Sequence, residues 1–163
     1  MPIRKIIRLI LLLALPASLP ANAADQLMQL ETRPEVTVPV FYMKRDGASA
    51  TVILLPGGNG SIGRLVDGKL SSGNFVVRSR DFFANAGFNV AVMSRPSDIK
   101  DLDYADRVAD EHLQDMQKLV EYLKADSGLP VWLVGTSRGT VSATAAAIRF
   151  GNTDLAGIVL TSS

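Results

Sequence analysis

The chain has 163 residues, 47% of them hydrophobic, which suits a single folded domain with its own core. Its formal net charge of +1 gives no basic surface for nucleic acid. The absence of cysteine excludes disulfides, thiolate metal sites and a cysteine nucleophile.

The N-terminus has the pattern of an export signal. Basic residues precede a short apolar run from Leu9 to Leu15, and Ala21-Asn22-Ala23 follows as an A-x-A cleavage site. The run is well short of the roughly 20 residues that a membrane-spanning helix needs. We therefore expect a signal peptide over 1–23 and a mature domain over 24–163. The mature protein would begin at Ala24, in the periplasm or the medium, without membrane attachment.

The first part of the mature chain predicts strands. Residues 27–32 form a weak strand candidate, and 36–43 a stronger one with β-branched and aromatic residues. Pro39 lies inside the second run and favours an edge position, because proline donates no ladder hydrogen bond. The continuous apolar run 51–55 is typical of a strand buried on both faces. We expect a small antiparallel meander that leads into a parallel sheet.

A glycine-rich loop, Pro56 to Gly63, follows that buried strand and allows two interpretations. The spacing of Gly58, Gly60 and Gly63 fits the G-x-G-x-x-G dinucleotide pattern, but neither a long helix nor a second strand ending in an acidic residue follows. In the other interpretation, the loop amides form half of an oxyanion hole, which requires a nucleophile later in the chain.

Helices and strands then alternate, which predicts a mostly parallel α/β sheet. A helix over 74–86 ends at Gly87, and a longer helix capped by Asp103 ends at Gly128. The remaining predicted elements are strands over 88–93, 131–134 and 155–160 and a helix over 141–150.

The sequence Gly135-Thr136-Ser137-Arg138-Gly139 matches the G-x-S-x-G nucleophile elbow between a strand and a helix. A serine on so sharp a turn adopts a sparsely populated backbone conformation. Side chains two residues before or after it would collide with neighbouring backbone, so Gly135 and Gly139 suit the turn. A serine that merely caps a helix is the alternative.

With this elbow, the glycine-rich loop and the alternation of elements, the chain resembles the N-terminal part of the α/β-hydrolase family. The resemblance implies that Ser137 is the nucleophile and that the amide of Arg138 is one oxyanion donor. It implies a second donor from the loop at Gly57, Gly58 or Asn59, with Gly58 and Asn59 preferred. The chain departs from the lipase-type HGGG sequence, because Pro56 stands in place of the histidine.

The rest of the triad does not follow the family order of Ser, Asp or Glu, then His. After Ser137 the only acid is Asp154, which precedes the last strand and should lie at the wrong end of the sheet. His112, the only histidine, lies in the preceding helix, where we expect no catalytic role. Asp98 and Asp101 are expected to be solvated loop charges. We therefore expect the domain to be truncated after the strand that follows the elbow helix. We also expect this chain alone to be inactive and poorly soluble.

These observations predict an exported serine hydrolase that acts on a small acyl substrate through an acyl-enzyme. Ester, thioester, lactone and amide substrates remain open, and no cofactor or metal is implied. A non-catalytic binding domain or pseudo-enzyme on the same fold is the first alternative. A dinucleotide-binding protein is the second.

Overall fold

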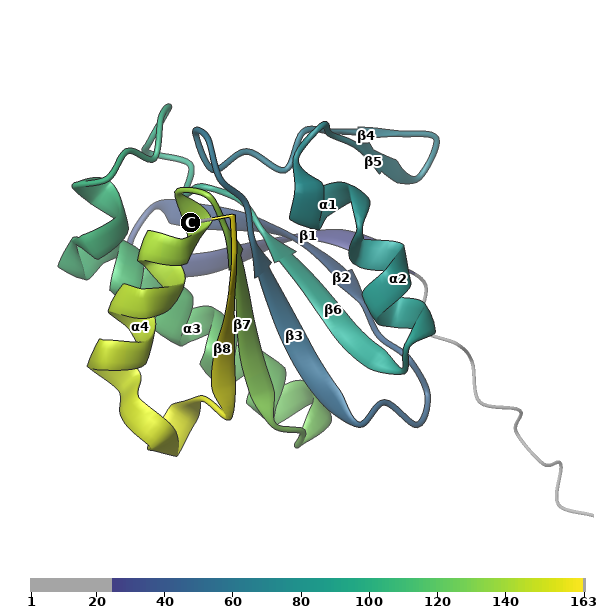
Figure 1. The fold of residues 1–163 in the computed structure, drawn as a ribbon. Helices are drawn as coiled ribbons and strands as arrows, with labels where there is room; N and C mark the ends of the chain where they lie inside the picture. The colour runs from purple at the N-terminus through teal and green to yellow at the C-terminus, as the bar shows by residue number, and fades with distance from the viewer. Residues whose placement is uncertain (1–24, 163) are drawn as a thin grey trace, which may run out of the picture.

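The computed structural model describes residues 25–162, so the predicted signal peptide lies outside the described residues. Its central sheet has six strands in the order β1-β2-β6-β3-β7-β8 (Figure 1). Strands β6, β3, β7 and β8 run parallel, whereas β2 is antiparallel to both β1 and β6. The sheet is therefore mostly parallel, as the sequence predicts. Its strands are β1 (Gln26–Arg33), β2 (Val36–Met43), β3 (Ala50–Leu55), β6 (Phe88–Met93), β7 (Val131–Thr136) and β8 (Gly157–Thr161).

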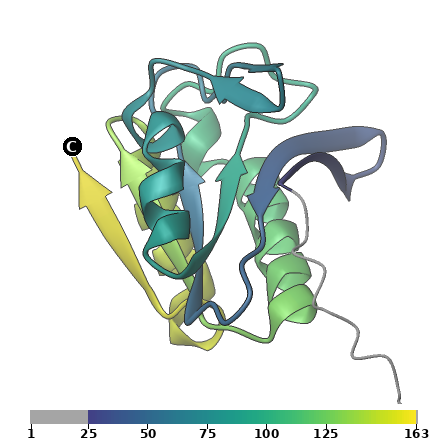
Figure 2. The ribbon, with the colours of Figure 1, turned by 90° about the vertical axis from the view of Figure 1, so that its right-hand side faces the viewer.

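Helices cover both faces of the sheet, and the sequence of β3 shows why. All six residues of β3 are buried. Ile53 and Leu55 join a core cluster under α3 (Asp110–Ser127) and α4 (Gly139–Asp154). Val52 and Leu54 join the cluster under α1 (Phe75–Arg78) and α2 (Arg80–Asn85), because successive side chains of a strand point to opposite faces. Figure 2 shows α1 and α2 on one side of β3 and β6 and α3 on the other.

Strand β2 is not an edge strand, although Pro39 favours that position. It lies between β1 and β6. Its pairing with β6 begins only at Val40, so Pro39 lies outside that ladder and its missing N–H costs no hydrogen bond there. The Pro39 carbonyl accepts a hydrogen bond from the amide of Ser94 at 2.9 Å.

Two helix predictions were wrong in their boundaries. The segment 74–86 forms two short helices, α1 and α2, that meet at Ser79. Asp103 does not cap the long helix: its carboxylate accepts hydrogen bonds from the amides of Ala105 at 2.7 Å and Asp106 at 3.0 Å. These bonds hold the turn that leads into the 3-10 helix Asp106–Val108, and α3 begins at Asp110, after this short helix.

The chain after the elbow also differs slightly from expectation. Helix α4 extends to Asp154, past Gly151, which has a non-helical backbone with φ 63°. Strand β8 begins at Gly157 and pairs only with β7, so it forms an edge of the described sheet. Val159 and Leu160 on this strand are each 44% exposed.

A buried ionic cluster ties the antiparallel strands to α3. Asp115 is fully buried and accepts hydrogen bonds from Thr32 Oγ1 at 2.6 Å and from Arg33 Nε at 2.8 Å and Nη2 at 3.0 Å. Arg33 also pairs with Asp98, whose role is thus structural. Its hydrogen bonds to Asp115 raise the pKa of Arg33 above its ordinary value. The cluster fixes β1 against the helix layer.

We predict that Asp115→Ala lowers the free energy of unfolding by about 2–4 kcal/mol. The partly buried Arg33 loses its Asp115 carboxylate partner, and the Thr32 hydroxyl loses its acceptor. Chemical denaturation measures this loss. Lys118→Ala is the control on the same helix, because its ion pair with Glu121 is exposed and should contribute less than about 1 kcal/mol. Equal losses in the two variants would contradict the prediction.

Candidate active site

Two loops meet at the carboxyl end of the parallel strands. Strands β3 and β7 are neighbours, and their register places Leu55 opposite Gly135. The loop that begins at Pro56 and the turn at Ser137 therefore leave the sheet side by side, at its upper end in Figure 1. Ligands of open α/β sheets bind at this end.

The turn at Ser137 has the backbone of a strained strand-to-helix connection. Strand β7 ends at Thr136, Ser137 has φ 50°, and α4 begins at Gly139. The Ser137 amide donates to the Thr161 carbonyl at 3.1 Å, and its carbonyl accepts from Thr140 N at 2.9 Å and Oγ1 at 2.7 Å. These bonds on both sides hold a conformation that non-glycine residues seldom adopt. The Ser137 side chain is left exposed.

Close backbone contacts explain the two elbow glycines. A Cβ at Gly135 would lie 2.5 Å from the Gly139 carbonyl oxygen. A Cβ at Gly139 would collide with the Leu55 carbonyl oxygen of β3. Gly57 has a similar constraint on the loop side, because its Cβ would lie 2.8 Å from Ser137 Cβ and 3.3 Å from Ser137 Oγ. The loop backbone thus lies directly against the serine.

The loop at Gly57 to Gly60 turns its carbonyls away and leaves amides free. All four carbonyls accept hydrogen bonds, from Gly60 N (3.2 Å), Arg107 Nη2 (3.1 Å), Leu102 N (3.2 Å) and Arg95 N (2.9 Å) in chain order. Within residues 25–162, the amides of Gly58, Asn59 and Arg138 donate to no protein acceptor. Free amides beside an exposed serine form a site where developing negative charge can be stabilised.

The structure does not support dinucleotide binding at the same glycines. Gly63 is followed by β4 (Arg64–Val66) and β5 (Lys69–Ser71), a two-stranded hairpin. A dinucleotide fingerprint needs a helix there, with its N-terminus at the pyrophosphate. The oxyanion-loop interpretation has no such requirement.

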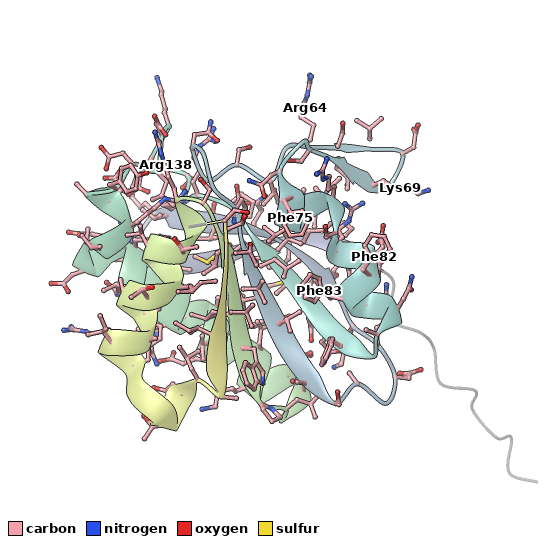
Figure 3. The ribbon with its side chains drawn as sticks, in the orientation of Figure 1. Arg64, Lys69, Phe75, Phe82, Phe83 and Arg138 are labelled. Atoms are coloured by element: carbon pink, nitrogen blue, oxygen red, sulfur yellow. The ribbon has the colours of Figure 1, made fainter. Side chains whose placement is uncertain are left out.

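The rim of the site carries Arg138 and an aromatic partner. The Arg138 guanidinium lies over the Tyr104 ring, 5.1 Å from its centroid, and 3.9 Å from Asp101. Figure 3 shows Arg138 at the upper end of the molecule, where α4 begins. The Asp101 side chain is 65% exposed, so it is a mostly solvated charge beside this cation.

Neither candidate for a triad base or acid reaches Ser137. His112 is buried, and its Nε2 lies 3.0 Å from Ser142 Oγ in α4. Asp154 precedes β8, whose first residue pairs with Trp132 at the opposite end of β7 from the serine. There Asp154 contacts Gln117 and Lys124. In the part of the chain that the structure describes, the hydrogen bonds of Ser137 are those of its backbone N–H and carbonyl.

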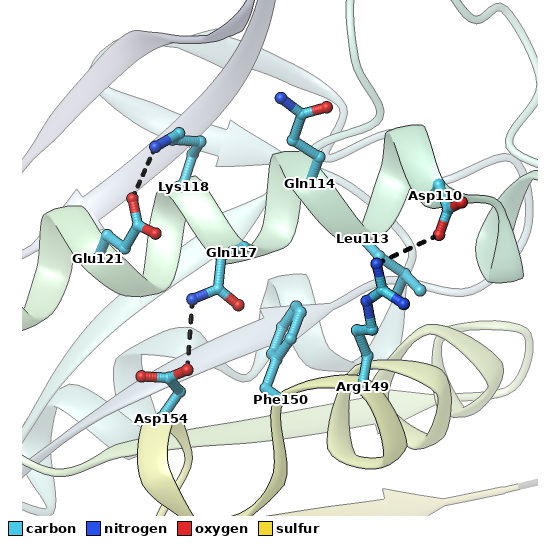
Figure 4. A pocket seen from close by; sticks show the side chains of 9 residues that line it. All are labelled: Asp110, Leu113, Gln114, Gln117, Lys118, Glu121, Arg149, Phe150 and Asp154. Atoms are coloured by element: carbon cyan, nitrogen blue, oxygen red, sulfur yellow. Dashed lines mark hydrogen bonds and ion pairs between the residues drawn. The ribbon is translucent and has the colours of Figure 1, made fainter.

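A surface hollow lies away from the serine. It has a volume of about 550 Å³ and lies between α3 and α4 (Figure 4). Its lining is mostly polar, with an ion pair between Asp110 and Arg149 at 3.7 Å. Its lining residues lie on α3 and α4 between Asp110 and Asp154, so the hollow shares no residue with the loop and elbow.

Arg107 is the residue near the site that sequence reasoning missed. It is 1% exposed and donates to Gly58, Leu102 and Ser142. Burial, followed by the charge of Arg138, lowers its pKa to about 10, so it stays cationic at neutral pH. Nothing in the acidic segment around it distinguishes it from a solvated surface arginine.

Solved structures resemble this fold. A dienelactone hydrolase from Anabaena variabilis aligns over 83% of this chain and 62% of its own, with 15% identity and a TM-score of 0.63. A carboxyl esterase from Bacillus coagulans aligns over 84% and 44%, with 18% identity and a TM-score of 0.59. A cold-adapted esterase from an Arctic metagenomic library aligns over 82% and 58%, with 16% identity and a TM-score of 0.54.

These likenesses show that the chain has an α/β-hydrolase fold. It spans between 44% and 62% of the length of these three structures. No protein-family model and no curated protein matches the chain. Within residues 25–162 no cluster of three or more His, Asp or Glu is placed to hold a metal ion. In the same range, no helix is long and apolar enough to cross a membrane.

We predict that His112 makes stability depend on pH. Burial, followed by the charges of Arg107 and Arg33, lowers its pKa from 6.5 to about 4. The unfolded chain therefore binds a proton at a higher pH than the folded chain does. The contribution of neutral His112 to the free energy of unfolding is therefore fully present above about pH 6.5. It falls by about 3 kcal/mol as the pH is lowered toward 4.

Chemical denaturation of the wild-type protein and His112→Gln at pH 7, 5.5 and 4 isolates this contribution. The difference between the two proteins should shift in favour of the variant as pH falls, because carboxylate titration is common to both. A difference that stays constant with pH would contradict the prediction.

Proposed function

We propose that this protein is a serine hydrolase that transfers an acyl group from a small ester-like substrate to water. The observation that carries the proposal is the exposed Ser137, held at φ 50° against a loop whose carbonyls all turn away. That combination presents a nucleophile and free amides to one substrate carbonyl. The esterases and the dienelactone hydrolase among the structural neighbours support this class of chemistry.

In the proposed reaction, Ser137 Oγ attacks the carbonyl carbon and gives its proton to a base. The carbonyl oxygen becomes an oxyanion, which accepts hydrogen bonds from the amide of Arg138 and from the amide of Gly58 or Asn59. Collapse of the tetrahedral intermediate breaks the bond to the leaving group and leaves an acyl-enzyme. Water then attacks the acyl-enzyme and frees Ser137. Loss of one oxyanion donor typically costs about 10²–10³ in rate.

We propose that the base and its orienting acid come from outside these 163 residues. The only histidine, His112, is engaged with Ser142, and Asp154 lies at the far end of the sheet. A serine without its base is a weak nucleophile, and triad members act as a unit. The chain alone is therefore expected to be inactive.

The second candidate is a non-catalytic binding domain that keeps the same loop and turn. The turn supports either function, because fold and elbow geometry alone do not specify catalysis. The two candidates differ in what a mechanism-based probe does to Ser137.

We predict that a fluorophosphonate probe labels Ser137 in the protein expressed from its complete reading frame. Ser137→Ala should abolish labelling while thermal unfolding still shows a cooperative transition. Mass spectrometry of the labelled peptide identifies the site.

His112→Ala serves as the matched control, because that residue contacts Ser142 and not the nucleophile. Its labelling rate should stay within about twofold of wild type at a temperature where the variant is folded. Labelling that survives Ser137→Ala would move the nucleophile elsewhere. A complete absence of labelling would favour the binding domain.

We also propose export, on the strength of the basic start, the apolar run 9–15 and Ala21-Asn22-Ala23. Protein recovered from the periplasm or medium of an expressing bacterium should begin at Ala24. N-terminal sequencing checks this, and Ala23→Arg should block processing because the cleavage site requires small residues. Exported protein that retains Met1 would contradict the proposal.

A further inference from the structure

The carbonyls of the loop are held in two different ways. Three of them, on Gly57, Asn59 and Gly60, accept from backbone amides. The fourth, on Gly58, accepts from a side chain, Arg107 Nη2, at 3.1 Å. A side-chain contact is the one element of this arrangement that a single substitution removes.

The Gly58 carbonyl belongs to the central peptide of a tight turn. The Gly60 amide donates to the Gly57 carbonyl at 3.2 Å, so Gly58 and Asn59 are the two central residues. Gly58 has φ 57°, and Asn59 has no positive φ, which is the pattern of a type II′ turn. Rotation of this central peptide gives type I′, which needs positive φ at both residues. Glycine and asparagine both tolerate that conformation, so the sequence permits either state.

The two states present opposite groups on the exposed side of the loop that contacts Ser137 through Gly57. In a trans peptide the C=O and N–H point in opposite directions, and the described peptides are all trans. The Gly58 carbonyl now points to the buried Arg107, so the Asn59 amide points away from it, toward the exposed side of the loop. The rotated peptide would instead direct the Gly58 carbonyl oxygen to that side, where it would repel an oxyanion.

Hydrogen bonds to three separate segments hold the Arg107 side chain in position. Its Nε donates to the Leu102 carbonyl at 3.1 Å and its Nη1 to Ser142 Oγ at 3.0 Å. The amide of Leu102 in turn holds the Asn59 carbonyl at 3.2 Å. No carboxylate among residues 25–162 forms an ion pair with Arg107, although a buried cation without one is costly. Its guanidinium instead donates hydrogen bonds to the Gly58 carbonyl in the loop, to the Leu102 carbonyl and to Ser142 in α4.

We infer that Arg107 is a positioning residue that keeps the Gly58–Asn59 peptide in the orientation that presents amides to the substrate oxygen. The inference rests on the proposed function of Ser137. The guanidinium also polarises the Gly58 carbonyl, which strengthens the amide of the same peptide as a donor. Arg107 acts through the peptide and does not touch the substrate.

The test uses the complete protein with Arg107→Lys and Arg107→Gln. Lysine keeps the charge but cannot reach all three acceptors, and glutamine buries no cation, so its cost to folding is lower. The fluorophosphonate reaction is separated into probe affinity and maximal labelling rate. We expect the maximal rate to fall by about 10-fold or more, up to the 10²–10³ of a lost oxyanion donor, with affinity unchanged within about twofold.

A second readout follows the turn without any reaction. In ¹⁵N-labelled protein, the amide resonances of Asn59 and Gly60 and the coupling that reports φ at Asn59 should change in the Arg107 variants. Arg80→Lys is the matched control, because Arg80 is 6% exposed and donates to one backbone carbonyl, Val77, on the other face of the sheet. That variant should lower the melting temperature and leave the labelling rate and the Asn59 resonance unchanged.

The outcomes separate the two proposals. Unchanged labelling rates and an unchanged Asn59 resonance in the folded Arg107 variants would overturn the positioning role. Equal rate losses in Arg107→Lys and Arg80→Lys would also overturn it, because they would indicate general destabilisation. If wild-type protein is never labelled, the proposed hydrolase function fails. The resonance of Asn59 then still decides whether Arg107 controls the turn.

Discussion

The site depends on the close approach of two backbones where β3 and β7 leave the sheet. The register of these parallel strands sets Leu55 opposite Gly135, so the residues just beyond them must share very little space. Gly57, Gly135 and Gly139 each lie where a Cβ would come within 3 Å of a neighbouring atom. Larger residues would separate the loop from the turn and take the free amides away from Ser137.

This packing also holds the strained serine. A positive φ at a non-glycine residue costs of order 1–3 kcal/mol and persists only where the surroundings determine it. Here the Thr161 carbonyl holds the Ser137 amide, and Thr140 holds its carbonyl with two donors. Hydrogen bonds to β8 and to the first turn of α4 thus offset the strain. The same arrangement leaves the Arg138 amide unbonded within the described chain, where it is available to a ligand.

Much of the fold follows from sequence because local patterns and packing agree. The apolar run of β3 predicts a strand with two covered faces, and G-x-S-x-G marks a turn whose steric needs are visible in its glycines. Pro39 wrongly predicts an edge position for β2, because its effect depends on where the β2–β6 ladder begins. Only the tertiary structure determines that point. The start of α3 was wrongly predicted because the Asp103 carboxylate accepts hydrogen bonds from the turn before the 3-10 helix and not from α3. Arg107 is invisible in the sequence because its partners are two backbone carbonyls and a helix hydroxyl, brought together only by folding.

The central claim is that Ser137 and the amides of Arg138 and the loop act on one substrate oxygen. A crystal structure of the complete protein with a phosphonate bound covalently to Ser137 Oγ tests it most directly, because the phosphoryl oxygen occupies the place of the oxyanion. We predict that this oxygen lies about 2.7–3.1 Å from the Arg138 amide and from the Gly58 or Asn59 amide. A phosphoryl oxygen that points to solvent or to other donors would contradict it.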